Sequence, residues 1–198
     1  MPDTATMLDT RSTAAAAVDL VLGEVESLLT RIRQEQSDRL QELAEAVSAA
    51  DRVFVHGAGR SGIAVRGLAM RLMHLGKPTF VVGETTTPAI GRGDLLLAVS
   101  GSGSTPGVLR AAESACGAGA RVAAVTNNAS SPLGRLATVT LTVGAASKTD
   151  HSGTASAQYA GSLFEQGVAL VGDALFHDLW QRSGLGAADI WPRHANLE

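Results

Sequence analysis

The chain has 198 residues, of which 45% are hydrophobic and 18% are charged, a composition typical of one soluble globular domain. Its formal net charge is −3, and aromatic residues make up only 4% of the chain. With no basic stripe and few rings on which bases could stack, the sequence argues against a nucleic-acid-binding protein.

The cysteine content and the first residues of the chain bear on its compartment. Cys116 is the only cysteine, so no intrachain disulfide can form, as is typical of a protein from the reducing cytosol. Residues 1–12 lack the apolar core of a signal peptide, and no apolar stretch reaches the ~18 residues of a membrane-spanning helix. We therefore expect a cytoplasmic protein without a membrane association.

Apolar residues recur at helical spacing from Val18 to Ile32 and again from Leu40 to Val47, which predicts two amphipathic helices. We expect residues 1–36 to form a helical extension and residues 37–198 to form the main domain. In that domain short apolar strands alternate with helices. The expected strands are 52–56, 79–82, 95–99, 121–126 and 139–143, and the expected helices are 62–75, 105–116, 132–136 and 155–182. This alternation predicts an α/β fold with a parallel sheet covered on both faces.

Two of these strands lead through a Gly/Ser-rich loop directly into a helix. Ligands of parallel sheets bind beyond the carboxyl ends of the strands, where the helix N-termini offer N–H groups to an anion. One such loop is equally well explained as a tight turn capped by hydroxyl groups, but two at neighbouring strands favour a shared phosphate site. The candidate phosphate-binding residues are Gly59, Arg60, Ser61, Ser100, Ser102, Gly103 and Thr105.

The first loop also fits a different cofactor. Gly57, Gly59 and Gly62 form a G-x-G-x-x-G pattern, and Glu84 follows Gly62 by 22 residues, as in dinucleotide-binding domains. Arg60 and Ser61 add a charge and a hydroxyl group where small apolar residues would pack in a dinucleotide-binding domain. The second loop repeats the anion-binding chemistry, which one dinucleotide does not require, so we favour the phosphate site and expect no cofactor.

Six segments together resemble the 6-phospho-3-hexuloisomerase family, in order and over about residues 37–198. They are GAGRSG at 57–62, AMRLMHLG at 69–76, VGETTTP at 82–88, SGSG at 100–103, GSLFEQ at 161–166 and RHANLE at 193–198. The SGSG segment alone indicates only a SIS domain, whereas the second, third and last segments are much more specific. One departure is Tyr159-Ala160-Gly161, where relatives often have Pro-Met-Gly.

The resemblance implies a SIS-domain three-layer α/β/α sandwich with a five-stranded parallel sheet, preceded here by N-terminal helices. It implies interconversion of D-arabino-hex-3-ulose 6-phosphate and D-fructose 6-phosphate in the ribulose monophosphate route of formaldehyde fixation. It further implies no metal or organic cofactor, a homotetramer with sites at subunit interfaces, and a functional link to 3-hexulose-6-phosphate synthase.

Moving a ketone from C3 to C2 requires a base that carries a proton between these two carbons. Glu165 is the best candidate, because it lies in an apolar helix whose neighbouring turns contain no lysine or arginine. We expect an unpaired, poorly solvated carboxylate with a raised pKa. The alternatives are a glutamate that reaches solvent or one that pairs with an arginine from elsewhere in the chain.

Two histidines and a threonine cluster complete the candidate site. His74 could polarise the carbonyl or shuttle the hydroxyl proton, but the last turn of a helix also favours histidine for its dipole, and both interpretations stay open. His194 lies in a polar tail where histidine is usually solvated, yet the resemblance implies that a late histidine from a neighbouring subunit enters the site. Thr85, Thr86 and Thr87 could bind sugar hydroxyls or simply cap a loop.

The sequence leaves two other functions open. Another SIS isomerase, acting on arabinose 5-phosphate or sedoheptulose 7-phosphate, would share the loops without needing this C-terminal ending. A sugar-phosphate sensor would bind without catalysis, but such regulators usually carry a helix-turn-helix domain. The first ~50 residues are too few and too acidic for such a domain.

Overall fold

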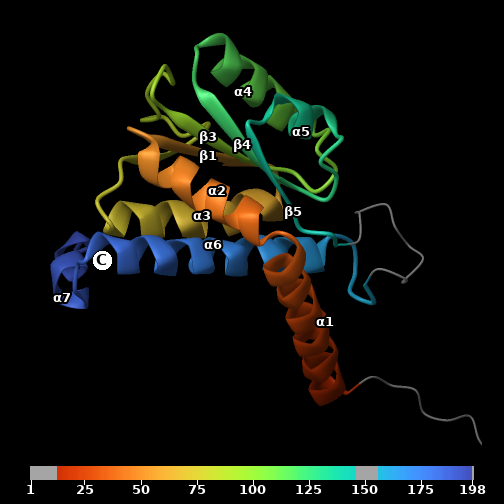
Figure 1. The fold of residues 1–198 in the computed structure, drawn as a ribbon. Coiled ribbons are helices and arrows are strands. Elements are labelled where there is room, and N and C mark those ends of the chain that lie inside the picture. Colours follow the sequence, from red (N-terminus) through yellow and green to blue (C-terminus); the bar gives the residue numbers. More distant parts are fainter. Residues whose placement is uncertain (1–12, 146–155, 198) are drawn as a thin grey trace, which may run out of the picture.

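The computed structural model describes residues 13–145 and 156–197, and its ordered centre is a parallel β-sheet (Figure 1). Within the described residues the sheet has five strands in the order β2-β1-β3-β4-β5. The strands are β1 Val53–Gly57, β2 Thr79–Val81, β3 Leu95–Val99, β4 Arg121–Thr126 and β5 Val139–Thr142. All four neighbouring pairs are parallel, which confirms the α/β fold class and the five-stranded parallel sheet.

Helices cover both faces of this sheet, as the apolar strands require. Figure 1 shows α4 and α5 on one face and α2 and α3 on the other, with α6 packed beyond α3. The bounds are α2 Ser37–Ala49, α3 Arg60–His74, α4 Pro106–Gly117, α5 Pro132–Leu136 and α6 Ser162–Ser183. Alternate residues of β1 enter opposite cores: Val53 and Val55 face the α2, α3 and α6 side, and Phe54 faces the α4 side. Every residue of β3 is buried.

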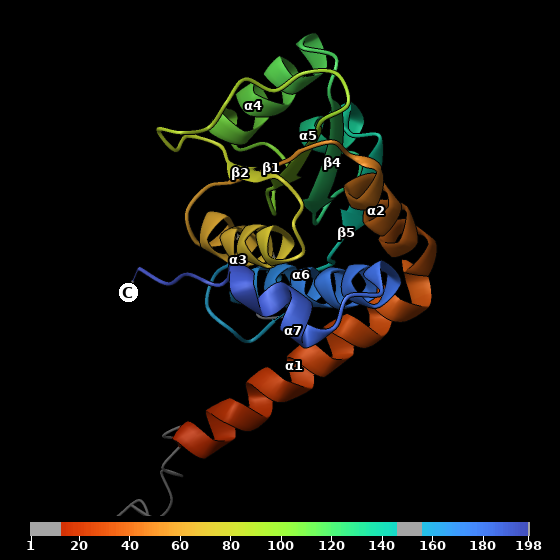
Figure 2. The ribbon, with the colours of Figure 1, turned by 90° about the vertical axis from the view of Figure 1, so that its left-hand side faces the viewer.

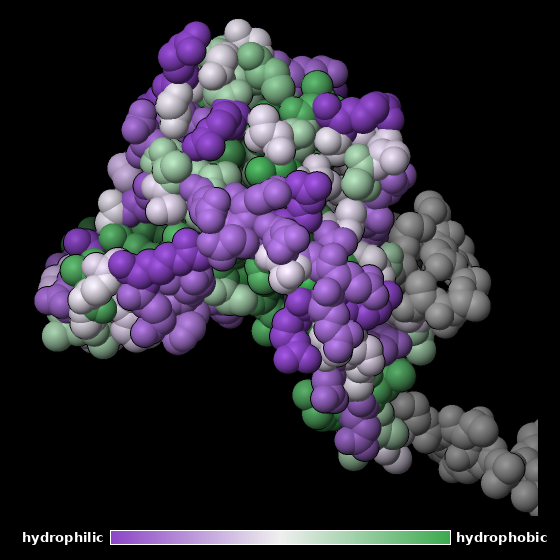
Figure 3. All heavy atoms as spheres, viewed as in Figure 1, coloured by the Kyte–Doolittle hydropathy of each residue, from purple (hydrophilic) through white to green (hydrophobic). Residues whose placement is uncertain are grey.

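The N-terminal helix α1, Ala14–Glu35, joins this body at only one end. Its C-terminal half buries Leu28 and Ile32 in the core that contains α6. The other half projects away from the domain in Figures 1 and 2, and Val18 and Leu22 are exposed there. Hydrophobic surface is visible on this projecting half in Figure 3. The two expected N-terminal helices are therefore confirmed, and α1 leaves an apolar surface without a cover in one chain.

The long helix expected from residue 155 begins later than the sequence suggested. α6 starts at Ser162, residues 156–161 form a turn, and residue 155 lies outside the described residues. Ala160 has φ +53°, which no α-helix contains. The cause is tertiary: Glu24 of α1 accepts hydrogen bonds from Ser156 and from the backbone N–H of Ala157, which holds this stretch out of the helical conformation.

The segment after α6 returns to α3. The helix α7, Ala187–Ile190, and the 3₁₀ turn Trp191–Arg193 follow α6. Arg193 then donates a hydrogen bond to the carbonyl oxygen of His74 (2.9 Å), the last residue of α3. None of the helices in the described part of the chain is long and apolar enough to cross a bilayer.

Candidate functional site

The two glycine loops leave neighbouring strands at the topological switch point of the sheet. β1 and β3 lie side by side, and Gly57 at the end of β1 pairs in register with Val99 at the end of β3. The chain turns to α3 on one face after β1 and to α4 on the other face after β3. In open α/β sheets, ligands generally bind beyond the strand ends at such a divergence. The structure thus brings the two loops together, as the sequence predicted.

The first loop sets the N-terminus of α3 directly on the end of β1. A Cβ atom added at Gly62 would lie 2.4 Å from the carbonyl oxygen of Gly57, so only glycine permits this approach. The N-cap residue, Gly59, has no side chain to satisfy the first N–H groups of α3. Ser61 is buried in the first turn. Orphan N–H groups at a helix start are the donors that a phosphate group uses.

The second loop is folded against β4. Gly103 has φ +62°, and a Cβ there would lie 2.0 Å from the hydroxyl oxygen of Ser131, so both backbone and packing require glycine. The N-cap residue Thr105 makes no capping hydrogen bond to α4, because its hydroxyl pairs with that of the buried Ser100 (2.9 Å). The Ser102 hydroxyl accepts from the backbone N–H of Ser104 (3.2 Å). Ser104, whose hydroxyl also donates to Ser102 (3.0 Å), was not among the predicted residues.

Glu165 lies in the first turn of α6 and forms an ion pair with the first loop. Its side chain is only 6% exposed, and its Oε2 atom lies 2.8 Å from Nε of Arg60. Arg60 also donates from Nη1 to the hydroxyl of Ser162 (2.9 Å), one turn before Glu165. The expectation of an unpaired carboxylate was therefore wrong. The partner lies at the first glycine loop, more than 100 residues away, and no helical pattern around Glu165 could reveal it.

His74 and His194 meet at the other end of α3. Their rings are stacked with centroids 3.9 Å apart, and Trp191 lies against His194 at 4.7 Å. Burial lowers the pKa of His74, and the nearby His194 and Arg71 lower it further. Since a helix rises 1.5 Å per residue, Arg60 and His74 lie about 21 Å apart along α3. Within one chain the structure therefore brings the two histidines together, but not next to the Arg60–Glu165 pair.

The three predicted threonines follow β2, at the same edge of the sheet as the glycine loops, and their environments differ. Thr87 donates its hydroxyl to the carbonyl oxygen of Val81 (2.6 Å), which holds the turn after β2. Thr85 and Thr86 are exposed on the same loop, at the carboxyl edge of the sheet. His56, the penultimate residue of β1, is half-buried; burial lowers its pKa, while a hydrogen bond with the backbone of Gly107 acts in the opposite sense. This bond links β1 to the start of α4.

The dinucleotide pattern has another explanation in the structure. Gly57 and Gly62 are required by the contact between α3 and β1, whatever is bound. Glu84, the candidate ribose ligand, is half-exposed and faces Arg66 at 3.9 Å. Among the described residues no three His, Cys, Asp or Glu side chains gather as a metal-binding group. The site residues therefore fit a phosphate better than a dinucleotide.

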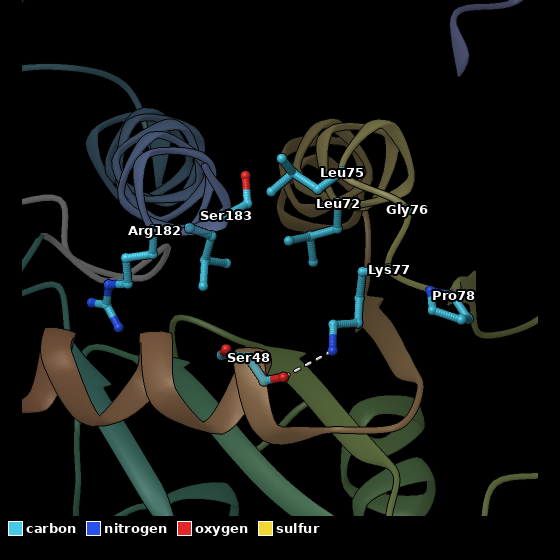
Figure 4. Close-up of a pocket in the computed structure, with 9 residues that line it drawn as sticks. Ser48, Leu72, Leu75, Gly76, Lys77, Pro78, Arg182 and Ser183 are labelled. Atoms are coloured by element: carbon cyan, nitrogen blue, oxygen red, sulfur yellow. Dashed lines mark hydrogen bonds between the residues drawn. The ribbon is translucent and has the colours of Figure 1, made fainter. Parts of the chain in front are cut away.

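A cavity of about 280 Å³ lies at the opposite end of α3, between α2 and the end of α6 (Figure 4). Lys77 and Arg182 line it, together with Leu72 and Leu75. Figure 4 shows Lys77 reaching the carbonyl oxygen of Ser48 at the end of α2, a hydrogen bond of 2.9 Å. Because its ammonium group also donates to the carbonyl of Ala50 (2.7 Å), Lys77 acts as a cap for α2. We therefore place the candidate site at the glycine loops.

A parallel sheet of this order, with two serine- and glycine-rich loops at its switch point, defines a doubly wound α/β domain whose ligands bind beyond the carboxyl ends of the strands. The model of one family, the SIS domain, matches residues 46–166. This chain therefore belongs to the SIS-domain family.

Relatives narrow the family further. The chain is 48% identical to a 3-hexulose-6-phosphate isomerase of Mycobacterium gastri over 93% of this chain and 97% of the relative. It is 36% identical to a 3-hexulose-6-phosphate isomerase of Bacillus subtilis over 90% and 95%, respectively. A solved structure from Methanococcus jannaschii, from which a 3-hexulose-6-phosphate isomerase function was inferred, matches with a TM-score of 0.80 at 29% identity, covering 92% and 99%. The chain belongs with these 3-hexulose-6-phosphate isomerases, which are also called 6-phospho-3-hexuloisomerases. The comparisons therefore confirm the resemblance.

Proposed function

We propose that this protein interconverts D-arabino-hex-3-ulose 6-phosphate and D-fructose 6-phosphate, with Glu165 as the base. One observation carries the proposal: at the switch point of the sheet, a buried carboxylate is paired with Arg60 at the N-terminus of α3, which has no side-chain cap. The 48% identity to the Mycobacterium gastri isomerase supports this choice of sugar phosphate.

The phosphate group at C6 binds where the two loops meet. The free N–H groups in the first turns of α3 and α4 bind the anion, and each helix adds the positive end of its dipole. Hydroxyl groups of Ser61, Ser100, Ser102 and Thr105 provide further hydrogen bonds to the anion. This arrangement fixes one end of the sugar, so that the reacting carbons at its other end take a defined position.

Glu165 then moves a proton between C2 and C3. Its carboxylate removes the proton from C2 of the hexulose phosphate, which leaves a cis-enediolate with its negative charge on the oxygen at C3. Return of the proton to C3, with transfer of the hydroxyl proton from the oxygen at C2 to the oxygen at C3, gives fructose 6-phosphate. Thr85 and Thr86 lie at the same edge of the sheet, where they can contact the sugar hydroxyls.

Arg60 stabilises charge during this transfer. Its Nη1 donates to Ser162, and its Nε lies 2.8 Å from the carboxylate of Glu165. The rest of the guanidinium group can face the substrate, because the side chain is 59% exposed. A fixed cation beside the reacting carbons favours the enediolate over the neutral sugar and so lowers the barrier.

A second subunit completes the site in this proposal. Because His74 and His194 lie far from Glu165 of their own chain, we assign them to the site of a neighbouring copy in a homotetramer, where they handle the hydroxyl protons. Ile63 (70% exposed) and Met70 (52% exposed) support such packing, since they leave an apolar stripe along α3. We further propose that the enzyme works in the cytoplasm on hexulose phosphate from 3-hexulose-6-phosphate synthase.

The test is an assay that generates the hexulose phosphate in situ and follows fructose 6-phosphate. We expect turnover by the wild type and a loss of at least about 100-fold in Glu165→Gln. The control is Asp173→Asn, which removes an exposed carboxylate from the same helix and is expected to retain activity. Turnover of only arabinose 5-phosphate or sedoheptulose 7-phosphate would contradict the proposed substrate and show that the protein is a different sugar-phosphate isomerase. Binding of a sugar phosphate without any turnover would contradict catalysis and favour a sensor.

A further inference from the structure

The turn before α6 is held by a single carboxylate from the N-terminal helix. Glu24 accepts hydrogen bonds from the hydroxyl of Ser156 (2.7 Å), the backbone N–H of Ala157 (2.7 Å) and the side-chain amide of Gln158 (3.0 Å). Three donors thus converge on one side chain more than 130 residues away in the sequence. Glu24 lies outside residues 46–166, which match the SIS-domain model.

The same turn leads directly to the proposed base. The side-chain amides of Gln158 and Gln166 form a reciprocal pair at 3.1 and 2.9 Å, and Gln166 is the residue after Glu165. On the other side of the turn, the carbonyl oxygen of Tyr159 accepts from the hydroxyl of Ser162 (2.8 Å). Ser162 in turn accepts from Arg60. Both sides of the first turn of α6 are therefore fixed through the segment that Glu24 holds.

The backbone of this turn needs an external restraint. Ala160 has φ +53°, a conformation that costs a residue with a side chain about 1–2 kcal/mol. Hydrogen bonds to a carboxylate are among the stronger ones in proteins, and three of them offset such a cost. The Glu24 contacts therefore explain why the strained turn is stable next to the site.

We propose that Glu24 is a positioning residue for the isomerase reaction: through Gln158 and Gln166 it fixes the start of α6 and thereby the carboxylate of Glu165. The inference rests on the proposed function, because it takes Glu165 as the base. It assigns a role in catalysis to a helix outside the SIS-domain core.

Glu24 is charged under the conditions of the reaction. Burial raises its pKa, but the hydrogen bonds from Ser156, Ala157 and Gln158 outweigh this and leave the pKa below the ordinary value of 4.5. The network is therefore intact at neutral pH, where substitution rather than titration is the way to break it.

The first measurement is the steady-state kinetics of Glu24→Ala. Because a misplacement of about 1 Å can lower a rate by about 100-fold, we expect kcat to fall about 10- to 100-fold. The phosphate loops are untouched, so KM is expected to stay within about threefold. Glu26→Ala is the matched control, because Glu26 is an exposed glutamate on the same helix. Urea unfolding of both variants identifies any loss of activity that comes from unfolding.

Two further measurements separate positioning from general damage. If Glu24 acts through Gln158, the double variant Glu24→Ala/Gln158→Ala loses no more kcat than the worse single variant. Hydrogen exchange of the amides at 157–166 is expected to quicken about tenfold in Glu24→Ala and not in Glu26→Ala, because the bond to Ala157 is lost.

Three outcomes would overturn the inference: an unchanged kcat in Glu24→Ala, unchanged exchange in this segment, or fully additive losses in the double variant. Absence of turnover by the wild type would instead overturn the proposed function. The exchange experiment needs no substrate, so it would still decide whether Glu24 holds the start of α6.

Discussion

The contact between α3 and β1 is made by two glycines, and the substitution Gly62→Ala tests whether this contact sets the geometry of the first glycine loop. An alanine Cβ would lie 2.4 Å from the carbonyl oxygen of Gly57 and 3.0 Å from its carbon. Ordinary contact begins near 3.4 Å, so the start of α3 must move by about 1 Å. Both atoms are backbone, and no side chain can rotate to relieve the clash.

Two magnitudes follow from that shift. Overpacking of this kind lowers the free energy of unfolding by about 1–3 kcal/mol, which urea denaturation measures. The N–H groups of the first turn and the Arg60 side chain move with the helix, so we expect kcat/KM to fall about 100-fold in the fructose 6-phosphate assay. The same helix supplies a control: nothing lies within 4 Å of a Cβ at Gly67, and Gly67→Ala is expected to stabilise the protein by up to about 1 kcal/mol. Equal activity and stability of Gly62→Ala and the wild type would refute this reasoning.

Three other predictions follow from buried groups. Asp94 is 2% exposed and paired with Arg52, which is 35% exposed, so Asp94→Asn should cost about 2–3 kcal/mol of unfolding free energy by urea titration at pH 7. Since the hydrogen bond from Arg52 lowers the pKa of Asp94, this loss should vanish only as the pH falls below the ordinary value of 3.8; a loss that persists there would contradict the ion pair. The pKa of His74 is lowered by burial, so the wild type should lose stability as the pH falls through 6.5, more steeply than His74→Gln does; parallel pH curves would exclude the burial effect. Phe164, fully buried beside Glu165, should cost about 3–5 kcal/mol when replaced by alanine, and a cost under 1 kcal/mol would show that the core can collapse around the site.

Local sequence patterns were sufficient for most of the sheet. β3 was predicted at its observed bounds, and β4 and α5 likewise, because continuous apolar runs and proline or glycine breaks act within a few residues. The pairing of the two loops followed from topology, since parallel strands place their carboxyl ends at one edge. The predicted start of α6 was wrong, because a hydrogen bond from Ala157 to Glu24 overrides the local helix propensity.

The sequence by itself determined the fold class, the two glycine-rich loops and the family, and it predicted Glu165 as the base. Each of these features follows from short motifs or from residue periodicity, which do not depend on distant contacts. Only the tertiary structure decided that Arg60 pairs with Glu165, that His194 stacks on His74, and that Glu24 holds the turn before α6. These contacts join residues more than 100 positions apart, and they exist because α1, α3 and α6 pack against one another.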